Sequence, residues 1–229
     1  MRLIVLDTET TGLDPAQGHR VIEIGCVEIV NRAFTGRVFH TYLNPDRDSD
    51  PGALAVHGLT TEFLSDKPRF ADTAEELLAF LQGGEIVIHN AEFDTRFVNA
   101  ELARIGRGVL HDHCVNVIDS LAHARELHPG KRNSLDALCE RYGISNAHRS
   151  LHGALLDARL LAEVWLAMTR GQDTLAIELD RFDPSVLPVI AASERELADH
   201  AQYLAALDKA VGGECVWRKF EPAPAAPGA

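Results

Sequence analysis

Two carboxylates, Asp7 and Glu9, stand two positions apart in the segment VLDTETTG, at the end of the apolar run 3–6. Successive side chains of a strand point to opposite faces, so we expect both acids on one face and Thr8 on the other. Adjacent carboxylates repel each other unless a cation lies between them. Oxygen ligands of this kind suit hard ions such as Mg²⁺ or Mn²⁺. The alternative is a strand end at which both acids are merely hydrated.

Three residues further along the chain could complete such a site. Asp94 lies in HNAEFDTRF, in the first turn of a predicted helix with Asn90 as its N-cap. An acid at this place also complements the helix dipole without any further function. His152 and Asp157 stand five residues apart in SLHGALLDARL. Five residues turn a helix through roughly 140°, so these side chains converge only if His152 precedes the helix and Asp157 lies one turn inside it.

Strands and helices must position these side chains. Hydrophobic patterns and turn residues predict strands at 3–8, 21–30, 37–44, 85–90 and 114–119. Helices are predicted at about 73–82, 91–106, 120–128, 134–142 and 153–169. The first of these helices is expected to begin with a capping box of Thr73 and Glu76. Strands that later alternate with helices indicate an α/β fold, with a mixed sheet flanked by helices.

The pattern loosens after residue 170. We expect a catalytic domain at 1–170, a flexible linker at 171–192, a helical segment at 193–220 and a disordered tail at 221–229. Within the helical segment, residues 193–211 open with a capping box of Ser193 and Glu196 and carry one apolar stripe.

Composition narrows the classes of function. The chain has 22 basic and 34 acidic residues, a net charge of −12, which argues against nucleic-acid binding through a broad basic surface. An enzyme that holds one strand end through metal ions remains compatible with that charge. Four scattered cysteines without a C-x-x-C pair are typical of a reduced, cytoplasmic protein. No apolar run approaches the roughly 18 residues of a membrane span, so no membrane association is expected.

The segments DTETTG, NAEFD and HGALLDA, in this order, resemble the DEDD exonuclease superfamily in its histidine-bearing branch, and most closely the proofreading subunits of bacterial DNA polymerase III. The resemblance covers residues 1 to about 170 and includes VHGLT before the first predicted helix. It implies a ribonuclease H-like fold with a five-stranded sheet, and 3′→5′ removal of mismatched primer ends. Two alternatives are a stand-alone exonuclease acting on RNA or single-stranded DNA ends, and a non-catalytic module that bridges polymerase and clamp.

The resemblance also implies roles for the residues. Two divalent ions, Mg²⁺ or Mn²⁺, would be held by Asp7, Glu9, Asp94 and Asp157, and His152 would be the general base. The substrate would be contacted by Asp7, Glu9, His57 and Asp157. For His57 the alternative is a loop histidine bonded to nearby backbone. The related proteins carry a glutamate shortly before this histidine, where Gly52 stands here, so terminal-nucleotide contacts are expected to be fewer.

The C-terminal segment implies protein partners. GQDTLAIEL contains Gln172, Leu175 and Ile177, which look like the peptides that dock bacterial replication proteins on the sliding clamp. Alternatively, the two apolar residues pack the linker back onto the domain. By resemblance, the 193–211 helix and its flanks would bind the polymerase catalytic (alpha) subunit. HDHC at 111–114 lacks a second ligand pair at finger spacing, so no zinc site is expected there.

Overall fold

A computed structural model of the chain describes residues 1–146, 151–170 and 192–220. The chain divides into two compact units, residues 1–175 and 176–229. The predicted clamp peptide (Gln172, Leu175 and Ile177) and the tail at 221–229 lie outside the described residues. Among the helices described, none is both long and apolar enough to cross a membrane.

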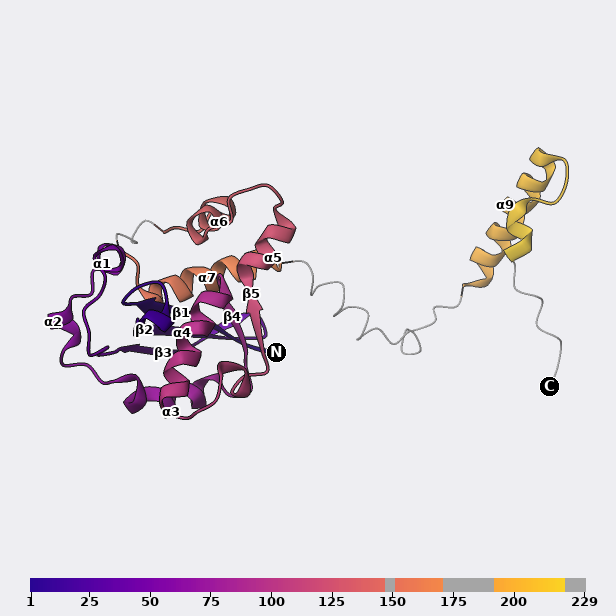
Figure 1. The fold of residues 1–229 in the computed structure, drawn as a ribbon. Helices are drawn as coiled ribbons and strands as arrows, with labels where there is room; N and C mark the ends of the chain where they lie inside the picture. Colours follow the sequence, from indigo (N-terminus) through magenta and orange to yellow (C-terminus); the bar gives the residue numbers. More distant parts are fainter. Residues whose placement is uncertain (147–150, 171–191, 221–229) are drawn as a thin grey trace, which may run out of the picture. The chain divides into compact units, whose positions relative to one another are not determined.

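A mixed sheet organises the N-terminal unit (Figure 1). Within the described residues it has five strands in the order β3-β2-β1-β4-β5. The strands are β1 (Arg2–Thr10), β2 (Val21–Val30), β3 (Ala33–Tyr42), β4 (Glu85–Ile88) and β5 (Asn116–Asp119). β2 runs antiparallel to β1 and β3, whereas β4 runs parallel to β1 and β5. The predicted five-stranded mixed sheet is therefore confirmed.

Helices cover both faces of this sheet (Figure 1). They are α3 (Phe70–Leu81) and α4 (Ala91–Arg104) on one face, and α5 (Ser120–Leu127), α6 (Leu135–Tyr142) and α7 (Ala154–Met168) on the other. Side chains of β1 alternate between the two cores: Ile4 and Leu6 pack with α3 and α4, and Leu3 and Val5 pack with α6 and α7. A strand that is buried on both faces in this way reads as a continuous apolar run, which is the pattern at 3–6.

Two predicted boundaries were wrong. β1 extends to Thr10, so Asp7 and Glu9 lie inside the strand rather than at its end. α3 begins at Phe70, one turn before the predicted capping box, and Asp72 accepts the backbone N–H of Arg69 at 2.9 Å. Thr73 instead donates its hydroxyl to the carbonyl of Phe70. The helix begins earlier because Phe70 is buried on the same core face as Leu77.

The segment around VHGLT includes two short helices on either side of the non-helical residues 58–60. It contains α1 (Pro51–His57) and α2 (Thr61–Leu64), which the hydrophobic pattern did not reveal because most of their side chains are exposed. The residues at the two ends of α1 are the sequence signal that could have revealed this helix. Pro51 occupies the first turn, and Gly58 takes the left-handed conformation (φ 70°) and donates its N–H to the carbonyl of Leu54.

The C-terminal unit contains α9 (Glu194–Val211) and a short 3-10 helix, Val216–Phe220. The predicted capping box is present: Glu196 donates its N–H to the Ser193 hydroxyl, and its carboxylate accepts the Ser193 N–H at 2.8 Å. Asp208 ties the two helices together by accepting the N–H of Cys215 and the guanidinium of Arg218. In this unit Leu204 and Cys215 are buried, while Leu197, Tyr203, Val211 and Trp217 are exposed.

Candidate active site

A cleft opens at the carboxyl ends of β1, β4 and β5. β4 pairs with β1 only from Leu3 to Val5, whereas β1 continues to Thr10 along β2. Asp7 and Glu9 therefore lie on the part of β1 that β4 no longer covers. The cleft has a volume of about 600 Å³. Ligands of open α/β sheets bind at this end of parallel strands, because the diverging chains leave room there.

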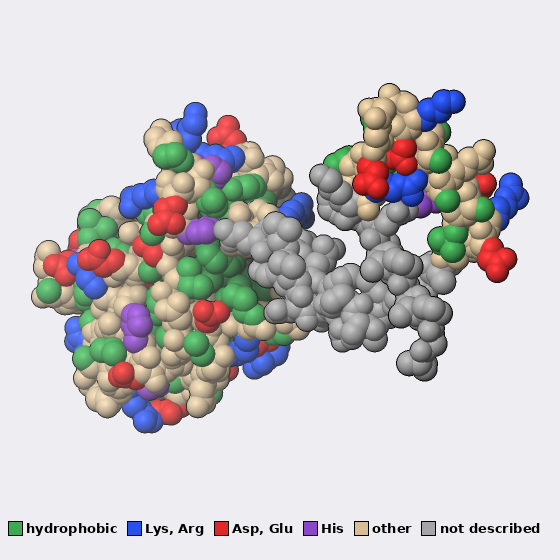
Figure 2. Space-filling model, turned by 90° about the vertical axis from the view of Figure 1, so that its right-hand side faces the viewer, with side chains coloured by type: hydrophobic (Ala, Val, Ile, Leu, Met, Phe, Trp, Pro, Cys, Tyr) green, Lys and Arg blue, Asp and Glu red, His purple; other side chains and the backbone are tan. Residues whose placement is uncertain are grey.

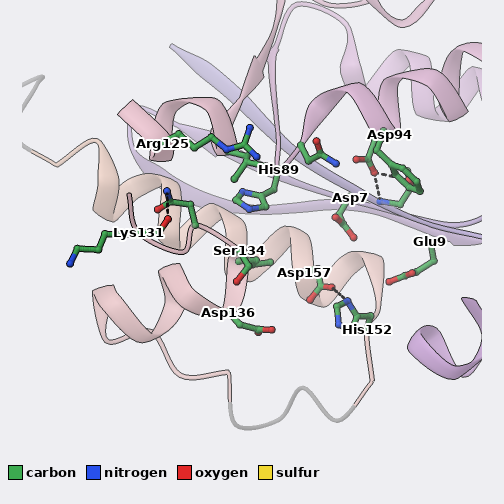
Figure 3. A pocket seen from close by; sticks show the side chains of 16 residues that line it. Asp7, Glu9, His89, Asp94, Arg125, Lys131, Ser134, Asp136, His152 and Asp157 are labelled. Atoms are coloured by element: carbon green, nitrogen blue, oxygen red, sulfur yellow. Dashed lines mark hydrogen bonds and ion pairs between the residues drawn. The ribbon is translucent and has the colours of Figure 1, made fainter. Parts of the chain in front are cut away.

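The start of α7 brings two more residues to the carboxylates (Figure 3). His152 precedes the helix, and Asp157 lies one turn inside it, with its N–H donated to the carbonyl of Gly153. The condition for the two side chains to converge is therefore met. His152 Nδ1 lies 3.3 Å from Asp157 Oδ2, and the Asp157 side chain is only 4% exposed, against 46% for His152.

A glycine on β2 lets α7 approach so closely. Gly25 pairs with Asp7, and a Cβ added to Gly25 would lie 2.3 Å from the backbone nitrogen of Leu155. The first turn of α7 thus rests on bare backbone beside the acidic residues. His152 is also anchored by its N–H, which donates to the carbonyl of Val56 at 3.1 Å. This hydrogen bond joins the end of α1 to the start of α7.

Asp94 reaches the site from the other face of the sheet. Its Oδ1 accepts the backbone N–H of Thr8 at 3.1 Å and the Thr8 hydroxyl at 2.7 Å. Thr8 alternates with Asp7 and Glu9 along β1 and points to the opposite face, as predicted, where it meets Asp94 of α4. Burial raises the pKa of Asp94 to about 7, against the Thr8 hydrogen bonds, which lower it. Asn90 is the N-cap of α4, but its side chain makes no capping hydrogen bond.

The side chains around the cleft fit a hard cation. One ligand atom from each of Glu9, His152 and Asp157 lies within 4.8 Å of the others, the one such group found among the described residues. Asp7 lies between Asp94 and Asp157 in Figure 3. A set dominated by carboxylate oxygens is the kind that Mg²⁺ and Mn²⁺ prefer.

His57 lies at the end of α1, beside a second pocket. Its Nδ1 accepts the backbone N–H of Leu59 at 2.9 Å, so the proton of the neutral ring is on Nε2. Nε2 is buried and has no hydrogen-bond partner among the described residues. Burial lowers the pKa of His57. The second pocket, about 460 Å³, shares Thr8, Glu9 and Phe93 with the cleft and is also lined by Gly52.

Sequence reasoning missed several residues that line the cleft: His89, Asn90, Phe93, Arg125, Lys131 and Asn133. His89 and Asn90 directly follow β4, so the rule that ligands bind beyond strand ends could have found them. His89 Nδ1 lies 2.9 Å from the Ser120 hydroxyl, and burial lowers the pKa of His89. Arg125 and Lys131 gave no signal, because they follow no strand and match no motif.

Comparison with known proteins agrees with this geometry. The exonuclease family model (RNase_T) matches residues 4–165. The protein named DNA polymerase III subunit epsilon in Salmonella typhimurium (strain LT2) is 49% identical over 95% of this chain and 97% of the relative. Its namesake in Escherichia coli (strain K12) is 48% identical over the same shares. The chain belongs to the epsilon family of exonucleases.

This epsilon-family member shares its fold with solved exonucleases. Exonuclease X in complex with 5′ overhanging duplex DNA is 25% identical, with a TM-score of 0.60 over 75% of this chain and 93% of that chain. Exonuclease I has a TM-score of 0.66 at 20% identity, over 78% of this chain and 43% of that chain. The predicted family, the ribonuclease H-like fold and the 3′→5′ exonuclease activity are confirmed, and the alternative of a non-catalytic module is set aside.

Proposed function

We propose that this epsilon-family exonuclease edits mismatched DNA primer ends with two divalent ions, Mg²⁺ or Mn²⁺, as part of a replicative polymerase. The observation that carries the proposal is the convergence of Glu9, His152 and Asp157 beside Asp7 at the open edge of the sheet. Figure 2 shows acidic and basic side chains interspersed over the face of the N-terminal unit in view, without a broad basic patch. Metal ions are therefore the natural means of holding a phosphodiester here.

Each acid has a role in this proposal. Asp7, Glu9, Asp94 and Asp157 would hold the ions, and Asp94 also fixes β1 through its hydrogen bonds with Thr8. When bound, the ions would stabilise the charge on the reacting phosphorus and on the departing 3′ oxygen. The rigid β1–β2 ladder keeps Asp7 and Glu9 on one face, so the ligands need little reorganisation.

His152 is the proposed general base. Its Nδ1 lies 3.3 Å from a carboxylate oxygen of Asp157, which orients the ring and favours the proton on Nδ1. Nε2 is then the nitrogen that takes up the proton of the attacking water. The 46% exposed side chain is accessible to that water. Proton transfer to a positioned histidine is a common form of general base catalysis.

His57 is proposed to contact the 3′-terminal nucleotide. His57 lines a pocket that adjoins Glu9, and its buried Nε2–H has no partner among the described residues. A hydroxyl or carbonyl oxygen of the terminal nucleotide would satisfy it. An added Cβ at Gly52 would meet nothing within 4 Å, which leaves room at the position where the resemblance leads us to expect a glutamate.

The partners are also proposals. α9 and its flanks would bind the polymerase alpha subunit, because Leu197, Tyr203 and Trp217 are exposed on a unit that is separate from the catalytic one. Gln172, Leu175 and Ile177 would dock on the sliding clamp. The protein would work in the cytoplasm, on the single-stranded 3′ end of a primer.

Digestion of a labelled primer–template tests the function. Paired and mispaired 3′ ends and the free single strand are compared with and without Mg²⁺ or Mn²⁺. Because a mispaired end costs less to unpair, single strands should be cut fastest, mispaired ends next and paired ends slowest, with little dependence on base identity. Hydrolysis with the metal chelated, or equal rates on all ends, would contradict the proposal. A faster reaction on RNA than on DNA would favour the stand-alone alternative.

A further inference from the structure

The cleft has two chemically different ends. One holds the carboxylates, and the other is lined by Arg125, in α5, and Lys131, in the loop between α5 and α6. Figure 3 shows both cations on the side of the cleft away from Glu9 and His152. Neither side chain has a hydrogen bond or ion pair within the described part of the chain. Asp136, on the same rim, accepts a hydrogen bond from Asn146 at 3.0 Å.

The loop that carries Lys131 is held in place by hydrogen bonds. Asn133, only 7% exposed, donates to the carbonyls of His128 and Lys131 and accepts from Arg141 at 3.1 Å. The second guanidinium nitrogen of Arg141 donates to the carbonyl of Arg132 at 2.7 Å. His128 in turn lies 2.8 Å from the Tyr142 hydroxyl. Because these hydrogen bonds already fix the loop, it loses little conformational entropy when a ligand binds. The loop therefore holds Lys131 at a defined place on the rim of the cleft.

The positions of the two pockets give the bound strand a direction. If the terminal nucleotide lies beside His57, the remaining strand must leave through the other end of the cleft, past His89 toward Arg125. Every nucleotide of that strand carries a negative phosphate. In a chain with a net charge of −12, two cations that no described residue neutralises are suited to bind it at this exit. Arginine adds a planar fork that matches phosphate oxygens.

We propose that Arg125 and Lys131 form a subsite for a backbone phosphate of the incoming single strand, on the 5′ side of the bond that is cut. The subsite rests on the proposed function, because it needs the scissile bond at the carboxylates. It supplies affinity without reading bases, since both side chains are cations and phosphate is the same at every nucleotide.

A double variant tests the subsite. R125Q/K131Q is compared with R132Q, which neutralises the next, exposed residue of the same loop, one that does not line the cleft. The substrates are a single-stranded oligonucleotide and the p-nitrophenyl ester of thymidine 5′-monophosphate, which has no strand on the 5′ side. We expect kcat/KM on the oligonucleotide to fall at least about tenfold in the double variant, with the ester unaffected. For the double variant on the oligonucleotide, the slope of log kcat/KM against log salt concentration should become less negative by about 0.7 for each phosphate that the protein no longer neutralises.

Neutral linkages locate the phosphate. A series of oligonucleotides carries one methylphosphonate each, moved stepwise from the 3′ end. At one position this neutral linkage should lower the rate of the wild type, whereas it should not further lower the already reduced rate of the double variant. Equal effects of the double variant and R132Q would overturn the subsite in favour of general charge attraction. Loss of ester hydrolysis in the double variant would also overturn it. If the wild type hydrolyses neither substrate, the proposed function itself fails.

Discussion

Gly25 lies opposite Asp7 in the β1–β2 ladder, and the backbone at the start of α7 occupies the space where a side chain of Gly25 would be. This close approach sets the distance between the strand that carries two acids and the helix that carries Asp157. A residue with no chemistry of its own thus positions the candidate site.

Gly25→Ala should separate these elements. The new Cβ would meet backbone atoms of Ala154 and Leu155, which cannot rotate away, so the first turn of α7 must shift. We expect hydrolysis of single strands to fall by about 100-fold, and the free energy of unfolding to fall by about 1–3 kcal/mol. Gly213→Ala is the control, because its Cβ would meet nothing within 4 Å. Wild-type turnover by Gly25→Ala would show that the close approach of α7 does not position the site.

Asp7→Asn should abolish hydrolysis, since Asp7 is one of the proposed ligands of the ions. The fold should survive with an unfolding temperature at least equal to that of the wild type, because one of the mutually repelling carboxylates is removed. Assays with Mg²⁺ and Mn²⁺, together with the rise in unfolding temperature that Mn²⁺ causes, provide the measurement. Asp66→Asn, at an exposed acid outside the cleft, is the matched control. Near-normal turnover of Asp7→Asn in Mg²⁺ would exclude the two-ion assignment.

His152→Ala should lower the rate about 10²–10⁴-fold while it leaves the affinity for single-stranded DNA nearly intact. The reason is that a general base acts in the chemical step and contributes little to binding. Single-turnover rates and DNA binding in Ca²⁺ separate the two effects. Should binding collapse while the bound complex reacts normally, His152 would be a substrate ligand instead of the base.

The Glu28 carboxyl group, which does not line the cleft, should make the free energy of unfolding depend on pH. Burial raises the pKa of Glu28, but hydrogen bonds from Arg2 (2.7 Å) and Thr35 (2.8 Å) and the charges of Arg2 and Arg37 bring it below its ordinary value. A carboxyl group whose pKa is lowered by folding stabilises the fold at pH values above its pKa in the unfolded chain, which is about 4.3 for Glu. That stabilisation is lost as the pH falls through the pKa of the folded chain. Glu28→Gln should therefore cost roughly 1–3 kcal/mol at pH 7, and less at pH 3. Urea unfolding at both pH values measures this, and a constant difference would refute it.

The two C-terminal interactions should separate. Truncation after about residue 185 should abolish binding to the polymerase alpha subunit and spare hydrolysis of free single strands, because α9 belongs to a separate unit. Replacing Gln172 and Leu175 by Ala should weaken only clamp binding. Pull-down with each partner and the single-strand assay test both variants. Co-purification of the truncated chain with the polymerase subunit would contradict this division.

Local spacing along the chain was enough to predict several features of the site. A period of two along β1 placed Asp7 and Glu9 on one face and Thr8 on the other. A loop position for His152, with Asp157 one turn into α7, allowed the two to meet. The order of the motifs along residues 1–170 indicated the family and the α/β fold, because each motif combines chemistry with the element that carries it.

Contacts between residues far apart along the chain became visible only in the folded structure. Asp94 reaches the site by binding Thr8, 86 residues earlier, and Gly25 packs against the start of α7. Arg125 and Lys131 line the cleft because α5 and the loop after it lie beside the end of β4. α1 was missed since its exposed side chains lack apolar periodicity, although it carries the buried His57. Such arrangements follow from how whole elements pack, and no local pattern in the sequence encodes the distance between residues far apart along the chain.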